Sequence, residues 1–265
     1  MQRLLLTLRY DGSRYHGWQV QPGAVTVQQT LQDAVEAVTG VRSGVTGCSR
    51  TDAGVHADMF CCAMDTASAL RGEKMAAALN AHLPRDIAVY GCQEVAEDFH
   101  PRYDARGKRY RYRIWNEPAR NPFWEGRAAH VRRPLDVPRL NEAARDYEGT
   151  HDFAAFCAAG AGTTESVRTV RRAWVERDGG LVSFVVEADG FLYNMVRIMV
   201  GTLLDMAAGH RSYLSIPAAI RSRDRAQAGP TAPAGGLILE RVFYDEMDDS
   251  TERSPSDGGQ TGLCG

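Results

Sequence analysis

Apolar and polar positions along the chain follow two periods, which predict a mixture of strands and helices. Residues 3–10 are typical of a strand, and apolar residues at helical spacing from Val27 to Val38 predict a helix. Thr26 and Gln29 match a capping box at its start, and Gly40 supplies its stop. Further strands are expected at 41–46, 57–64, 87–93, 108–115, 169–176, 182–187 and 237–244, and further helices at 73–82, 137–147, 191–207 and 216–222. Strand–helix–strand order recurs in both parts of the chain, so we expect an α+β fold.

The segment 108–115 alternates with period two. Tyr110, Tyr112 and Ile114 fall on one face of the expected strand, and arginines fall on the other, at 109, 111 and 113. Such a strand can offer aromatic stacking for bases beside phosphate contacts. It can equally bury its tyrosines in the core and leave its arginine face in solvent. The pattern alone leaves both interpretations open.

Composition sets the class of protein. The chain has 265 residues, of which 44% are hydrophobic and 24% charged, as in ordinary globular proteins. Its longest nearly apolar stretch, 191–204, carries Arg197 and is shorter than the ~20 residues of a bilayer span, so we expect no membrane segment. The N-terminus shows no signal-peptide pattern. Six cysteines without a C-x-x-C pair favour reduced thiols in a cytoplasmic protein and no metal site.

Charge is distributed unevenly along the chain. Residues 245–265 hold six acidic side chains and one basic one, which leaves residues 1–244 with 30 basic and 27 acidic side chains. Of those 30 basic residues, 28 are arginine. Because guanidinium groups bind phosphate through paired hydrogen bonds, this excess is a weak indication of an anionic partner. The segment 246–265 is rich in Gly, Ser and acidic residues and is expected to be a disordered tail.

One polar loop is the best candidate for chemistry. Residues 47–56 lie between two expected strands and include Arg50 and Asp52. A cation two residues away would favour the charged form of the Asp52 carboxyl and make it available as a nucleophile or a base. The alternative is an Arg50–Asp52 ion pair that only fixes the loop.

A second candidate is Arg197, in the middle of the apolar helix expected at 191–207. Its apolar neighbours predict that the guanidinium is at least partly buried, and a buried cation needs an anion. Asp52 or Asp205 could be that anion. The alternative is an arginine whose head group reaches solvent.

Five motifs in order resemble the bacterial tRNA pseudouridine synthase A family. They occupy residues 10–19, 47–57, 98–103, 109–112 and 190–197. The resemblance implies that Asp52 is the catalytic aspartate, that Arg50 helps to place a flipped nucleotide, that Tyr110 stacks on the target base and that Arg197 pairs with the catalytic carboxylate. Cys48-Ser49 departs from the small residues of many members, and the acidic tail is additional.

The resemblance also implies an architecture and a substrate. It implies two RRM-like halves, 1–105 and 106–245, whose mixed or antiparallel sheets join into one extended sheet with helices on one face and the catalytic loop in a central basic cleft. A homodimer would act on the anticodon stem-loop of tRNA and convert uridines 38, 39 and 40 to pseudouridine without a cofactor. The side chains expected to contact RNA are Arg14, Arg109, Arg111, Arg168 and Arg171.

Two other functions remain open from the residues alone. A non-catalytic RNA-binding module would explain the strand of aromatic and arginine residues but not the Arg50-Thr51-Asp52 loop. A small-molecule hydrolase with Asp52 as nucleophile would need none of the basic residues and would show no salt-dependent affinity for RNA.

Overall fold

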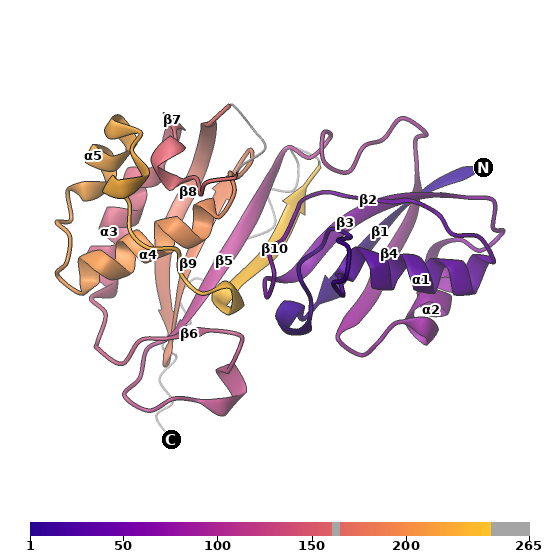
Figure 1. Ribbon diagram of the computed structural model, residues 1–265, viewed down its shortest axis with the longest axis horizontal. Coiled ribbons are helices and arrows are strands. Elements are labelled where there is room, and N and C mark those ends of the chain that lie inside the picture. The colour runs from indigo at the N-terminus through magenta and orange to yellow at the C-terminus, as the bar shows by residue number, and fades with distance from the viewer. Residues whose placement is uncertain (161–164, 245–265) are drawn as a thin grey trace, which may run out of the picture.

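The computed structural model describes residues 1–160 and 165–244. The expected tail at 246–265 lies outside these residues. One ten-stranded mixed sheet runs through the molecule in the order β4-β1-β3-β10-β5-β9-β8-β7, with β2 beside β3 and β6 beside β5 (Figure 1). The strands are β1 Gln2–Tyr10, β2 Val45–Gly47, β3 His56–Thr66, β4 Ile87–Val95, β5 Gly107–Trp115, β6 Ala129–His130, β7 Gly149–Asp152, β8 Val167–Asp178, β9 Leu181–Ala188 and β10 Leu237–Phe243.

Strand β10 joins the two ends of the sheet although it comes last in the chain. Ile238 and Leu239 pair with His56 and Ala57 of β3 in parallel register, and the other edge of β10 pairs with β5 in antiparallel register. Figure 1 shows this strand in yellow between β5 and the N-terminal strands. The loop that precedes β3 and the strand β5 therefore lie on either side of one central strand.

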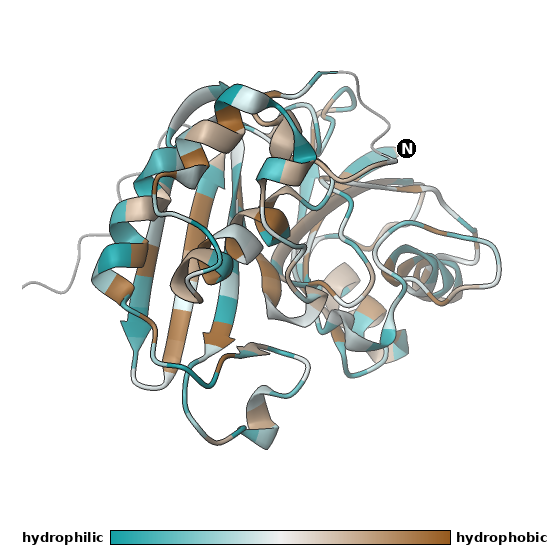
Figure 2. Cartoon of the chain, turned by 60° about the vertical axis from the view of Figure 1, so that its left-hand side comes forward, coloured by the Kyte–Doolittle hydropathy of each residue, from teal (hydrophilic) through white to brown (hydrophobic). Residues whose placement is uncertain are grey.

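Helices cover the sheet over both of its ends. They are α1 Val27–Thr39, α2 Gly72–His82, α3 Val137–Ala144, α4 Met195–Ala207 and α5 Ser215–Ser222. Helix α1 buries Val27, Leu31 and Val35, and α4 is buried along most of its length. Figure 2 shows brown and teal positions side by side along the helices, as expected of helices that cover a sheet on one side and meet solvent on the other. In the described ranges, no helix has the length and apolar character of a membrane span.

The local signals around α1 are largely confirmed. The Thr26 side chain accepts a hydrogen bond from the Gln29 amide at 3.3 Å, and Gly40 ends the helix at φ +73°. The Gln29 side chain bonds Asp33 instead of returning to Thr26, so only one half of the capping box is seen. Most other expected elements are present with ends shifted by a residue or two.

Three elements differ from the sequence expectation. Only Val45–Gly47 of the expected strand 41–46 pairs with β3. The expected helix 137–147 becomes a 3-10 turn after Ala144. Helix α4 begins at Met195 and not at 191, because Asn194 adopts a left-handed conformation with φ +60° directly before it. The short strands β6 and β7 were not expected.

Strand β5 has two differently filled faces. Tyr110, Tyr112 and Ile114 are buried, as the alternation predicts. The arginine face is not simply solvated, since Arg109 is only 8% exposed. Its guanidinium lies against Glu187 of β9, across the register that pairs the two residues.

Candidate active site

The loop 47–56 is fixed by the N-terminal motif 10–19. The Trp18 amide donates to the carbonyl of Thr51 at 3.1 Å, and the Gly54 amide donates to the carbonyl of Tyr15 at 3.2 Å. The hydroxyls of Tyr10 and Thr51 hydrogen-bond at 2.8 Å. The motif 10–19 therefore holds the backbone on both sides of Asp52.

Two glycines make this packing possible. A Cβ on Gly12 would stand 2.0 Å from the carbonyl oxygen of Val55. A Cβ on Gly17, which has φ +86°, would stand 2.4 Å from the carbonyl oxygen of Thr51. Only glycine lets the two loops approach this closely.

His56 anchors the far end of the loop. Its Nδ1 accepts a hydrogen bond from the Gly12 amide at 3.1 Å, and its Nε2 lies 2.9 Å from the carbonyl oxygen of Gly126 and 3.1 Å from that of Gly235. Because both of these oxygens are acceptors, Nε2 is the donor. This link was missed from the sequence, since residues 126 and 235 are far from His56 along the chain.

Asp52 and Arg197 form the central pair. The Arg197 Nη1 lies 3.2 Å from the Asp52 Oδ2, and the side chains are 17% and 26% exposed, respectively. The same Nη1 donates to the Asn194 side chain at 2.7 Å, and Nε donates to the carbonyl of Ala232 at 2.8 Å. The prediction that Arg197 is partly buried and paired with an anion is confirmed. Its partner is Asp52, whereas Asp205 pairs with Arg211.

Burial dominates the electrostatics of Asp52. It raises the pKa of the Asp52 carboxyl above its ordinary value, against the opposing charge and hydrogen bond of Arg197. The expectation that Arg50 lowers this pKa, or pairs with Asp52, is wrong. Arg50 is exposed and makes no hydrogen bond or ion pair with Asp52 in the described part of the chain. Arg50 is exposed whereas Asp52 is partly buried against Arg197, so closeness along the chain did not bring their side chains together.

Tyr110 of β5 lies above the same loop. Its hydroxyl is 3.3 Å from the Ser49 hydroxyl, and its ring meets Phe191 edge to face with centroids 5.0 Å apart. Burial raises the pKa of Tyr110, so this hydroxyl keeps its proton near neutral pH. Phe191 and Asn194 were not singled out from the sequence, although both lie in the matched motif 190–197. Ser49 was noted only as part of the departure at Cys48-Ser49.

Cys48, next to Ser49, is fully buried. Burial raises the pKa of its thiol to about 11, which leaves little thiolate at neutral pH. A thiol in this environment is a poor nucleophile.

The five basic residues expected to contact RNA lie in different surroundings. Arg109 pairs with Glu187 at 2.6 Å, and Arg111 pairs with Glu240 at 2.6 Å. Arg14 is 82% exposed and lies 3.3 Å from Asp86. Arg171 donates to the carbonyl of Arg106, and Arg168 donates to the carbonyl of Val167. The structure thus brings together Asp52, Arg197 and Tyr110. The other arginines are spread over strands β5 and β8, except Arg14, which lies in the 3-10 turn after β1.

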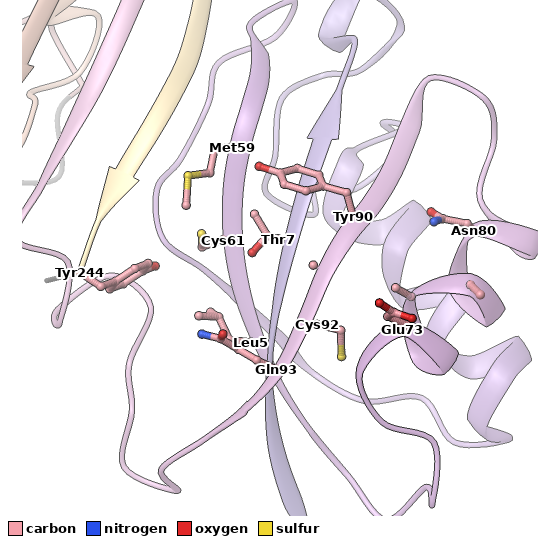
Figure 3. Close-up of a pocket in the computed structure, with 13 residues that line it drawn as sticks. Leu5, Thr7, Met59, Cys61, Glu73, Asn80, Tyr90, Cys92, Gln93 and Tyr244 are labelled. Atoms are coloured by element: carbon pink, nitrogen blue, oxygen red, sulfur yellow. The ribbon is translucent and has the colours of Figure 1, made fainter. Parts of the chain in front are cut away.

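A separate cavity of about 630 Å³ does not include these residues. It is lined by residues of β1, β3, β4 and α2 and by Tyr244, and Figure 3 shows Tyr90 and Met59 on one side of it. The convergence of charged and aromatic groups at Asp52, and not the cavity volume, identifies the candidate site. Within residues 1–160 and 165–244, no group of three or more His, Cys, Asp or Glu side chains is arranged to hold a metal ion.

Comparison with known proteins gives consistent results. The family described as tRNA pseudouridine synthase matches residues 7–104 and 143–245, which include Asp52 and Arg197. A protein named tRNA pseudouridine synthase A from Ruminiclostridium cellulolyticum is 44% identical over 246 residues, 92% of this chain and 100% of that protein. One from Acetivibrio thermocellus is 45% identical over 244 residues, with the same coverage. One from Myxococcus xanthus is 44% identical over 262 residues, 98% of this chain and 97% of that protein, so that match extends past residue 245.

Proposed function

Since this chain belongs to the tRNA pseudouridine synthase family and is an isomerase, we propose that it converts uridines 38, 39 and 40 in the anticodon stem-loop of tRNA to pseudouridine. The observation that carries the proposal is the half-buried Asp52 carboxylate beside Arg197, in a loop whose Ser49 hydroxyl lies 3.3 Å from the Tyr110 hydroxyl. We place the chemistry in a basic cleft between two RRM-like halves, about 1–105 and 106–245. We expect the protein to act as a homodimer in the cytoplasm.

The reaction moves one bond and changes no oxidation state. The N1–C1′ bond of uridine breaks, the uracil turns, and a C5–C1′ bond forms. The proton on C5 leaves, and N1 gains a proton, so atoms and charge balance. This chemistry needs no electron carrier and no energy input, which is why we propose that no cofactor takes part.

The target nucleotide must leave the stem before it can react. Flipping a base costs a few kcal/mol, which contacts in the pocket must offset. In the proposal, Tyr110 covers the flipped uracil and exposed Arg50 helps to place the nucleotide. The Asp52 carboxylate starts the reaction at the flipped uridine, and Arg197 holds it in place and in its charged form.

The other basic residues divide by their partners. Arg168 and Arg171 make no salt bridge among the described residues, and Arg14 is 82% exposed although it lies 3.3 Å from Asp86, so we retain these three side chains as RNA contacts. Carboxylates already neutralise Arg109 and Arg111, so we assign these two a role in holding the sheet.

Carbodiimide labelling tests the proposal directly. Unmodified tRNA is incubated with the protein, treated with carbodiimide and then with alkali, and read by primer extension. Stops at positions 38 to 40 that need the protein support the proposal, and product elsewhere or none would overturn it. The dimer is tested separately by sedimentation equilibrium.

A further inference from the structure

The chain has only two lysines, and they lie in opposite environments. Lys74 is exposed on α2, whereas Lys108 of β5 is only 9% exposed. Within the described residues, the Lys108 ammonium makes no hydrogen bond and no ion pair. Its Nζ keeps some contact with solvent, since it is not among the fully buried atoms that lack a partner. Holding a cation largely out of water without an acceptor is still unfavourable. The mechanism proposed above does not use Lys108, so its position needs another explanation.

Lys108 lies beside the candidate active site. It precedes Tyr110 by two residues, so strand alternation places both side chains on the same face of β5. The charge of Lys108 also acts on the thiol of Cys48, which adjoins Ser49 of the Asp52 loop. The ammonium is therefore next to the place where the flipped nucleotide would lie.

Arg168 approaches Lys108 from β8. Lys108 pairs with Ala188 of β9, and Ala188 pairs with Val170 of β8. Arg168 precedes Val170 by two residues and so lies on the same face. Its Nε would be 3.4 Å from a Cβ on Gly190, the residue before the Phe191 that contacts Tyr110.

Arg102 approaches from the other side. Lys108 pairs with Val242 of β10, and Tyr244, just past the end of that strand, donates to the carbonyl of Pro101 at 2.8 Å. Arg102 follows Pro101 and is exposed. The charges of Arg102 and Arg168 both lower the pKa of Lys108, in addition to the larger effect of burial.

Among the described residues, these three cations lack the carboxylates that neutralise Arg109 and Arg111, as do Arg113 and Arg172, which lie over tryptophan rings instead. No salt bridge of Arg102, Lys108 or Arg168 is found between described residues. Three like charges that converge without an acid are favourable only when an anion joins them. Since RNA carries one such anion at every linkage, a backbone phosphate fits the site.

We propose that Lys108, Arg102 and Arg168 bind one phosphate of the RNA backbone next to the flipped uridine, with Lys108 as the buried contact. The proposal rests on the proposed function, because the phosphate belongs to the same nucleotide strand that enters the Asp52 site. It extends that function by assigning a residue that positions the RNA strand at the active site. Lys108 is a positioning residue and does not touch the reacting atoms.

The test combines a protein variant with a neutral RNA linkage. Lys108→Met is compared with wild type and with Lys74→Met, the exposed matched control. The RNA is an anticodon stem-loop with a single methylphosphonate linkage, placed in turn at each phosphate flanking the target uridine. The RNA with the methylphosphonate and the RNA without it both carry a 2′-O-methyl group at the nucleotide next to that linkage, so they differ only in the charge of the linkage. Dissociation constants are measured at several salt concentrations.

We expect Lys108→Met to weaken binding about tenfold at low salt and to reduce the salt slope by about one, with Lys74→Met unchanged. One methylphosphonate should weaken binding to wild type by a similar factor and have no further effect on Lys108→Met. Lys108→Arg, which keeps the charge, should keep the effect of that linkage. The melting temperature of Lys108→Met without RNA should stay equal or rise, because an unpartnered buried charge is removed.

Three results would overturn the proposal. Lys108→Met could bind RNA as wild type does, or every neutral linkage could weaken the variant and wild type equally. A fall in melting temperature with unchanged RNA binding would make Lys108 a structural residue.

Carbodiimide labelling of the same samples distinguishes failure of the phosphate site from failure of the proposed function. If wild type modifies positions 38 to 40 but the neutral linkage weakens binding equally in wild type and in Lys108→Met, only the phosphate site is refuted. Wild type that binds no anticodon stem-loop refutes both.

Discussion

The charged residues of strand β5 have different partners on its two faces, although Arg113 on the arginine face also makes no salt bridge with a described residue and lies over the Trp124 ring. On one face, Arg109 and Arg111 each meet a carboxylate at 2.6 Å, and Arg109 is buried together with its partner. On the other, Lys108 has no carboxylate within the described residues, and the nearby Arg197–Asp52 contact is looser at 3.2 Å. A buried charge that is paired with an opposite charge usually stabilises the fold. A buried charge without such a partner is more typical of a site where a ligand supplies the opposite charge.

The Asp52 carboxylate is also held less completely than the carboxylates that pair with Arg109 and Arg111. Its carboxylate shares Arg197 with Asn194 and the carbonyl of Ala232, so it receives only part of the hydrogen bonding of that guanidinium. Burial therefore raises the pKa of Asp52 in spite of the cation. A carboxylate that is incompletely compensated is more reactive than one held by several donors.

The largest expected effect is that of Asp52→Asn. We expect kcat/KM for pseudouridine formation to fall by about 10⁴-fold or more, because a neutral amide can neither attack nor accept a proton. Affinity for tRNA should change by less than a few-fold. Asp65→Asn, which alters a partly exposed pair with Arg3, is the matched control. Turnover that survives in Asp52→Asn would remove this residue from the mechanism.

Asp52→Asn also tests the sign of the pKa shift. A carboxyl whose pKa is higher in the folded than in the unfolded protein binds its proton more tightly when folded. Its ionised form therefore lowers stability as pH rises through and above the unfolded pKa. At pH 7 the variant should melt at the same temperature as wild type or higher. A clear decrease in melting temperature, measured by calorimetry, would contradict the raised pKa of Asp52.

Arg197→Met is expected to have the next largest effect, about 10²-fold on kcat. Loss of the guanidinium removes the interactions that oppose the raised pKa of Asp52, so the acid limb of the kcat–pH profile should move to higher pH. The free energy of unfolding should fall by about 2–4 kcal/mol, because Asp52 and the carbonyl of Ala232 lose a partner. An unchanged acid limb would mean that another group sets the ionisation of Asp52.

Tyr110→Phe tests the role of the Tyr110 hydroxyl, on the face of β5 that also carries Lys108. Release of tritium from C5 of labelled uridine should slow by about 10- to 100-fold if the Tyr110 hydroxyl takes part in proton transfer. Affinity for tRNA should stay within a few-fold, because the ring remains. Tyr147→Phe removes a buried hydroxyl bonded to the carbonyl of Met199, away from the site, and serves as control. Equal rates in both variants would limit Tyr110 to stacking.

The smallest expected effect on activity is that of Arg109→Met. It leaves buried Glu187 without this partner and should lower the free energy of unfolding by about 3–5 kcal/mol, measured in urea. Activity per folded molecule should stay within about threefold of wild type. A large loss of activity with normal stability would move Arg109 to the RNA-binding surface and erase the contrast between the two faces.

Much of the fold followed from local signals. The cap at Thr26, the stop at Gly40 and the alternation of β5 depend on neighbours within a few residues, and all three are seen. The pair of Arg197 with an anion also followed, since an arginine inside an apolar helix must find a counter-charge. The error at Arg50 came from treating closeness along a loop as contact in space.

The sequence by itself determined where most strands and helices form and which loop holds Asp52, because these depend on periodicity, capping and residue type. Tertiary structure alone decided which charges meet. Glu187 reaches Arg109 through strand register, and β10 returns from the end of the described chain to bring the loop before β3 close to β5. Register fixes such contacts over separations that no local pattern records, and it leaves Lys108 without an ion pair among the described residues.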